Sequence, residues 1–127
     1  MRRALVYWMP VLVYAGVIFY LSSLPYVPGS GIVGLEQIDP ERLLLHLVEY
    51  GIFGFLLFRA FVSTENSSFV ERALLLATLI GFFYGITDEV HQYFVPLRSP
   101  SIADAISDGI GSFLGALVKR FFDFEYR

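Results

Sequence analysis

Cysteine is absent from this chain of 127 residues. Disulfide bonds, thiol catalysis and cysteine-ligated metal centres are therefore excluded, although this absence does not identify a compartment. Charged residues are also scarce, at 17% of the chain, whereas a typical soluble domain holds about 25%. The sequence contains no P-loop, nucleophile elbow or HExxH motif, so no short catalytic motif indicates a reaction.

Hydrophobic residues are abundant instead, at 56% of the chain, and the mean hydropathy is +0.63. They form four long apolar segments, at residues 4–24, 43–62, 73–94 and 102–122. Each is close to the roughly 20 residues that cross a bilayer core about 30 Å thick. The first segment is longer than the apolar core of a signal peptide, so we expect it to be retained. The sequence predicts an all-α, four-helix membrane bundle that forms one domain over residues 1–127.

The basic residues predict the orientation of this bundle. If the N-terminus is cytoplasmic, seven of the nine Lys and Arg residues lie inside, namely Arg2, Arg3, Arg59, Arg72, Lys119, Arg120 and Arg127. Only Arg42 and Arg98 then lie outside, together with most of the acidic residues. This positive-inside bias predicts cytoplasmic N- and C-termini. The net charge of −3 hides the asymmetry and gives no indication of nucleic-acid binding.

The last two segments carry the same spacing in opposite directions. The first pattern is Gly81, Gly85, Asp88 and Gln92, and the second is Asp104, Asp108, Gly111 and Gly115. On a helix each set lies on one face. The turn at residues 96–100 makes the two helices an antiparallel hairpin. We therefore expect close packing in which Gly81 meets Gly115, Gly85 meets Gly111 and Asp88 meets Asp108.

Ionisable residues inside a membrane are costly and usually functional. Glu49, Asp88 and Asp108 each lie about 9 Å below the outer end of their predicted helix, at 1.5 Å per residue. Together with Glu89 they are our candidate acid–base residues, because burial among like charges separates carboxylate pKa values. The alternative interpretation is that these side chains only hold the helices together.

A metal site is a further hypothesis. His46 and Glu49 are three residues apart and therefore neighbours on one helix. With Asp88 they could hold a divalent cation such as Zn, Mn or Mg, and otherwise the sequence leaves the cofactor open.

Ligand-binding candidates lie at the outer turn. Arg98 is interpreted as the only strong cation near the acids, and the start of the helix after it favours anions. Arg98, Gln92, Ser101 and Asp104 could therefore bind a phosphate or carboxylate. Two alternatives remain open: a salt bridge from Arg98 to Asp104 or Glu89, and a capping box formed by Ser101 and Asp104.

At these residues the chain resembles the VanZ-like family of small bacterial membrane proteins. The similar segments are Ser22-Ser23-Leu24-Pro25, His46-Leu-Val-Glu49-Tyr50 and Asp88-Glu89-Val-His91-Gln92, followed by Arg98 and Asp104. Tyr50 joins the ligand-binding candidates. Leu97 stands where the family's Pro-Gly-Arg turn has glycine, and Asp108 stands where Asn is common. The resemblance implies a link to resistance against glycopeptide antibiotics such as teicoplanin.

The resulting hypothesis is a multi-pass protein of the bacterial cytoplasmic membrane with an acidic pocket on the extracytoplasmic side. We expect the pocket to bind or act on an anionic envelope amphiphile, a membrane lipid or a lipid-linked precursor. Whether the protein is an enzyme stays open, and so does oligomerisation. The alternatives are a small proton- or cation-coupled transporter or flippase, and a non-catalytic structural membrane partner.

Overall fold

The computed structural model describes residues 2–25, 40–64 and 66–125, and within these ranges the chain is helical with short turns and no strand. The helices are α1 (Arg2–Ser22), α2 (Pro40–Val62), α3 (Ser67–Glu71), α4 (Ala73–Tyr93) and α5 (Ile102–Glu125). The all-α prediction is confirmed, and the four long helices match the four apolar segments. The irregular loop expected over residues 26–39 lies outside the described residues.

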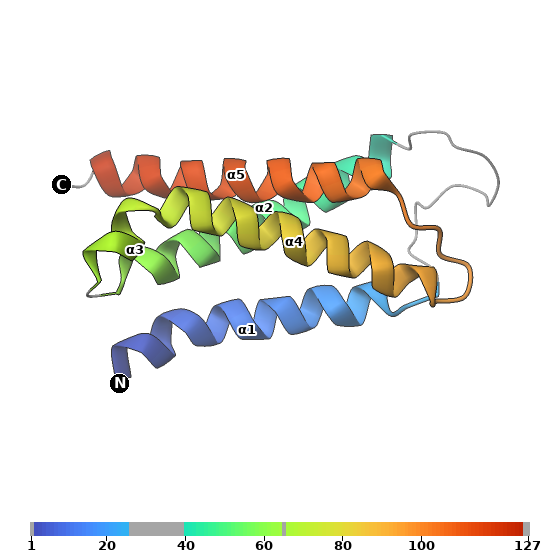
Figure 1. Cartoon of the computed structure of the whole chain (residues 1–127), viewed down its shortest axis with the longest axis horizontal. Coiled ribbons are helices and arrows are strands. Elements are labelled where there is room, and N and C mark those ends of the chain that lie inside the picture. Colours follow the sequence, from blue (N-terminus) through green and yellow to red (C-terminus); the bar gives the residue numbers. More distant parts are fainter. Residues whose placement is uncertain (1, 26–39, 65, 126–127) are drawn as a thin grey trace.

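The four long helices run side by side along the long axis of the molecule (Figure 1). α2 is the central helix, since it packs against α5 and also contacts α4 and α1. α1 lies at the edge of the bundle and contacts α2 and, less extensively, α4. The beginning of α1 and the end of α5 lie at one end, and the turn between α4 and α5 lies at the other (Figure 1).

Within the described part of the chain, three helices are long and apolar enough to cross a membrane, over Leu5–Ser22, Pro40–Val62 and Ala73–Tyr93. α5, at 24 residues, is long enough but is not one of them. Its polarity follows from the acidic, serine and glycine residues in its first half. These polar residues face inward, because Asp104, Ser107, Asp108 and Ser112 are all buried. Apolar residues cover the outward face of α5, including Ile106, Ile110, Phe113 and Leu117.

Small residues bring α2 and α5 into backbone contact. A Cβ added at Gly54 would lie 2.0 Å from the Ser112 carbonyl oxygen, and one at Gly115 would lie 1.7 Å from the Gly51 carbonyl oxygen. Only glycine allows backbones to approach this closely, as is common between membrane helices. The α2–α5 seam, defined by Gly51, Gly54, Gly111 and Gly115, therefore sets the spacing of the bundle.

The predicted glycine pairing between α4 and α5 is wrong. The atoms nearest to Gly81 belong to Ser112, and those nearest to Gly85 belong to Asp108. The physical reason is that Gly111 and Gly115 are used elsewhere, against α2. The two helices therefore meet in a register three residues from the predicted one.

Two connections between the long helices have local features of their own. Between α2 and α4 the chain forms the short helix α3, which Asn66 caps by accepting a hydrogen bond from the Ser68 amide. In the turn between α4 and α5, Leu97 has a φ of 65°. This left-handed conformation is costly for any residue with a Cβ. This penalty explains why glycine suits the position of Leu97 in the Pro-Gly-Arg turn of the family that the chain resembles.

We predict that Gly115→Ala separates α2 from α5 and destabilises the protein. Overpacking of this kind costs about 1–3 kcal/mol or more. Gly16→Ala is the matched control, because nothing lies within 4 Å of its Cβ position. That control should gain roughly 0.5–1 kcal/mol from helix propensity. Thermal unfolding of the purified protein in detergent measures both, and equal effects would contradict the close approach.

We also predict that Leu97→Gly stabilises the protein by about 1 kcal/mol, because glycine removes the left-handed penalty. The Leu97 side chain is 75% exposed, so its removal costs little packing. Leu97→Ala is the control that keeps the Cβ and hence the strain. Equal melting temperatures for the two variants would show that the turn is not strained.

Candidate functional site

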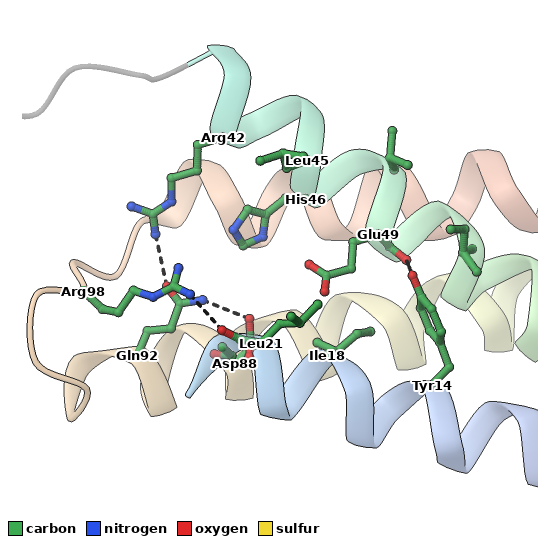
Figure 2. A pocket seen from close by; sticks show the side chains of 13 residues that line it. Tyr14, Ile18, Leu21, Arg42, Leu45, His46, Glu49, Asp88, Gln92 and Arg98 are labelled. Carbon is green, nitrogen blue, oxygen red and sulfur yellow. Dashed lines mark hydrogen bonds between the residues drawn. The ribbon is translucent and has the colours of Figure 1, made fainter. Parts of the chain in front are cut away.

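A pocket of about 320 Å³ lies between α1, α2 and α4 (Figure 2). Its polar lining comes from Arg42, His46, Glu49, Asp88, Gln92 and Arg98, with the hydroxyls of Tyr14 and Ser22. The apolar lining comes from Ile18, Leu21, Leu45, Val48 and Ile52. The rim residues Leu21, Leu45, Val48 and Ile52 are 41–54% exposed, so the pocket opens on the apolar surface of the bundle.

A chain of hydrogen bonds crosses the pocket from α2 to α4 (Figure 2). Arg42 Nη2 donates to Gln92 Oε1 at 3.1 Å, and Gln92 Nε2 donates to Asp88 Oδ2 at 3.1 Å. The carboxylate of Glu49 points into the same space. Among the described residues no group donates a hydrogen bond to that carboxylate. Asp88 is thus held by Gln92, whereas the Glu49 carboxylate is the pocket acid without such a partner.

Arg98 is bound to α1. Its Nε donates to the Leu24 carbonyl and its Nη2 to the Leu21 carbonyl, each at 2.9 Å, which satisfies the C-terminal end of the helix. Neither of the salt bridges considered for Arg98 is present among the described residues. Burial and the charge of Arg42 lower the pKa of Arg98 from its ordinary value, and nearby carboxylates oppose this effect. A guanidinium remains charged throughout the accessible pH range.

Arg42 lines the pocket but was not among the site residues predicted from the sequence. Its Nε lies 2.7 Å from Asp104 Oδ2, so Arg98 is not the only cation near the acids. A signal was available, because Arg42, His46 and Glu49 are spaced by four and three residues and share one face of α2.

A second polar cluster lies at the start of α5. We call it the α5 acid cluster, and its members are His46, Glu89, Asp104 and Asp108. His46 Nδ1 is 2.8 Å from Asp108 Oδ1, and His46 Nε2 is 3.9 Å from Asp104 Oδ2. All four side chains are buried, and Asp108 is completely so. The imidazole therefore stands between two carboxylates and forms the wall between this cluster and the pocket.

The N-terminus of α5 already has an anionic partner. Glu89 Oε2 accepts a hydrogen bond from the Ser101 amide at 2.6 Å. Ser101 Oγ accepts from the Asp104 amide at 3.4 Å, which is one half of the expected capping box. The anion that the helix start was predicted to attract is thus supplied within the chain by Glu89.

The predicted site residues fall into two groups. Glu49, Asp88, Gln92, Arg98 and His46 line the pocket. Glu89, Ser101, Asp104 and Asp108 lie behind His46 in or beside the α5 acid cluster. Tyr50 does not line the pocket. Its side chain is completely buried, with its ring next to those of Phe53 and His46, and among the described residues its hydroxyl has no hydrogen-bond partner.

The predicted metal ligands all fall in the first group. His46, Glu49 and Asp88 all line the pocket. The side chains whose ligand atoms gather most tightly are instead His46, Glu89 and Asp108. The two sets share only His46.

A protein-family model described as VanZ/LLP1 matches residues 7–123 of the chain. The chain belongs to the VanZ/LLP1 family. The match spans the four long helices and every residue of the pocket and of the α5 acid cluster. Searches of curated proteins and of solved structures find no match. The VanZ-like resemblance drawn from the motifs is confirmed.

In this VanZ/LLP1 family member, we predict that Arg42→Gln lowers stability strongly. The substitution leaves Asp104 buried without its ion-pair partner, and breaking such a pair costs about 3–5 kcal/mol. The double variant Arg42→Gln/Asp104→Asn should recover more than half of the loss, because the buried charge is gone. Thermal unfolding in detergent measures the cycle, with the exposed Arg120→Gln as control. A double variant no more stable than Arg42→Gln would contradict the assigned pair.

Proposed function

We propose that this protein crosses the bacterial cytoplasmic membrane four times, with both ends of the chain in the cytoplasm. Three spans meet the length and hydropathy requirement, and the arrangement of α5 supports a fourth. A helix with apolar residues outside and polar residues inside suits a bilayer, although its average hydropathy is low. The basic residues near the start of α1 and the end of α5 support the cytoplasmic assignment of that end.

The contacts of α4 also support a close-packed antiparallel hairpin with α5. Gly81 lies against Ser112 and Gly85 lies against Asp108, so one helix ascends while the other descends. In this topology the turn at residues 94–101 is extracytoplasmic, and the polar end of the pocket faces the same side.

The pocket binds an anionic amphiphile of the cell envelope, such as a polyprenyl phosphate or a lipid-linked peptidoglycan precursor. One observation carries this proposal: two arginines stand at the polar end of a pocket whose rim is exposed and apolar. Arg42 and Arg98 come from different parts of the chain, and their positive charges repel each other. Arg42 is already paired with Asp104, so a phosphate between the two guanidinium groups would chiefly compensate the charge of Arg98.

The lining suggests how such a ligand lies. The phosphate contacts Arg42 and Arg98, whose guanidinium groups offer five N–H donors each. The apolar tail leaves along Leu45 and Val48 into the lipid. Glu49 lies about 10 Å further along α2 than Arg42, at 1.5 Å per residue. There it meets the part of the ligand next to the phosphate, as hydrogen-bond acceptor or general base.

A link to glycopeptide resistance follows from the family resemblance. A protein that withholds or alters a lipid-linked envelope precursor would change the target that such antibiotics meet. Oligomerisation would not disturb this arrangement, because the pocket is formed within one chain.

A coupled transporter is the second candidate, and the α5 acid cluster favours it. His46 lies between Asp104 and Asp108, and rows of buried titratable groups are typical of proton- and cation-coupled carriers. Movement of a labelled lipid across liposomes without chemical change would favour the carrier, and a chemical product would favour an enzyme. Glu49→Gln should abolish the activity in either case, whether that activity is lipid movement or product formation.

The binding proposal predicts that a polyprenyl phosphate raises the melting temperature of the purified protein, whereas the uncharged polyprenol does not. A ligand that binds only the folded state must stabilise it. In Arg98→Gln, the same rise in melting temperature should require at least a tenfold higher concentration of polyprenyl phosphate. Arg120→Gln, at the opposite end of the bundle, is the control. Equal stabilisation by phosphate and alcohol, or an unchanged response in Arg98→Gln, would contradict the proposal.

A further inference from the structure

The α5 acid cluster contains three side chains from three helices with the ligand types of a metal centre. His46 comes from α2, Glu89 from α4 and Asp108 from α5. One ligand atom from each lies within 4.8 Å of the other two. The three residues are only 7%, 7% and 0% exposed. Their arrangement is held by the α2–α5 seam and by the close contact of Gly85 with Asp108.

Two of these side chains carry a buried oxygen that the described part of the protein does not satisfy. Glu89 uses Oε2 for the Ser101 amide, and its Oε1 has no hydrogen-bond partner. Asp108 uses Oδ1 for His46, and its Oδ2 has no hydrogen-bond partner. A buried carboxylate oxygen without a partner is costly. Two of them in one cluster require positive charge or protons.

The geometry around Asp108 directs its second oxygen toward α4. A Cβ added at Gly85 would lie 2.6 Å from Asp108 Oδ2. Glu89 follows Gly85 by four residues and therefore lies one turn further on the same face. Asp108 Oδ2 thus faces α4, the helix that also carries Glu89.

The charge balance favours a cation. Arg42 compensates Asp104, to which it is directly paired. Glu89 and Asp108 remain. Asp108 pairs with His46, which is charged only when protonated, and among the described residues no Lys or Arg forms an ion pair with either carboxylate. A divalent ion would compensate both carboxylates, and imidazole nitrogen with carboxylate oxygen suits Zn²⁺ and Mn²⁺.

We propose that His46, Glu89 and Asp108 bind one divalent transition-metal ion, Zn²⁺ or Mn²⁺, in a site next to the amphiphile pocket, with His46 as the residue that both share. The ion takes the place of the proton that His46 Nδ1 shares with Asp108. Atoms bound to one ion at about 2.1 Å are themselves roughly 3–4 Å apart, so the side chains need only small shifts. Because that proton is released, affinity falls as the pH falls. This inference does not rest on the proposed function.

The test uses the full chain, purified in detergent and stripped with a chelator. Titration calorimetry with Zn²⁺ and continuous-wave EPR with Mn²⁺ should each show one ion per chain. Asp108→Asn and Glu89→Gln should weaken binding at least tenfold. Asn at position 108 can still accept the hydrogen bond from His46, so this variant should stay folded, as size-exclusion chromatography and circular dichroism will show.

Glu49→Gln and Asp88→Asn distinguish this ligand set from the one predicted by sequence spacing, and both should bind the ion within threefold of the unmodified protein. Pulsed EPR of bound Mn²⁺ should show coupling to an imidazole nitrogen that His46→Gln removes. Three results would each overturn the site: no stoichiometric binding by the unmodified chain, no nitrogen coupling, or greater loss in Glu49→Gln and Asp88→Asn than in Glu89→Gln and Asp108→Asn.

Discussion

The close backbone contact between α2 and α5 is the constraint on which the other features depend. Gly54 and Gly115 leave no room for a side chain between the helices. In a membrane, lipid competes equally for apolar surfaces, so helix association relies on such packing and on interhelical hydrogen bonds. The contact turns the polar face of α5 toward α2. It thereby brings Asp104 to Arg42 and Asp108 to His46.

This packing divides the polar residues into two sites with different access. The pocket faces α1, the most loosely packed long helix, and its rim residues are exposed. The α5 acid cluster lies on the other side of His46 and is buried on all sides. Glu49 therefore lines an open pocket, whereas Asp108 has no exposed surface. His46 belongs to both sites, because it lines the pocket and forms a hydrogen bond with Asp108.

Much of the fold could be predicted from the sequence, because helix length and apolar periodicity determine which segments are helices and which faces are buried. Asp88, Asp104 and Asp108 lie inside the bundle, as their spacing indicated. The register could not be predicted in the same way. A stripe of glycines shows that a helix approaches a neighbour closely, but not which neighbour, and Gly115 packs against α2 although its pattern matched α4.

The electrostatic partners of the charged residues were harder to predict than the helix register. Arg98 looked like the natural cation for the acids because it is close in sequence, yet it binds the carbonyls at the end of α1. Arg42 is separated from Asp104 by a whole helix hairpin and became its partner only through the α2–α5 contact. A pairing of this kind depends on tertiary packing. The spacing on α2 could therefore indicate that Arg42 faces the site, but not that Asp104 is its partner.

Photo-crosslinking tests the central claim, a lipid-accessible pocket for an anionic amphiphile, most directly. The unmodified protein in nanodiscs would be irradiated with a diazirine-bearing polyprenyl phosphate, and the adducts mapped by mass spectrometry. The account predicts adducts on the rim of the pocket, at Leu21, Leu45, Val48 and Ile52, that excess polyprenyl phosphate removes and polyprenol does not. Adducts spread equally over other exposed residues, such as Leu75 and Phe83, and insensitive to either competitor would contradict it.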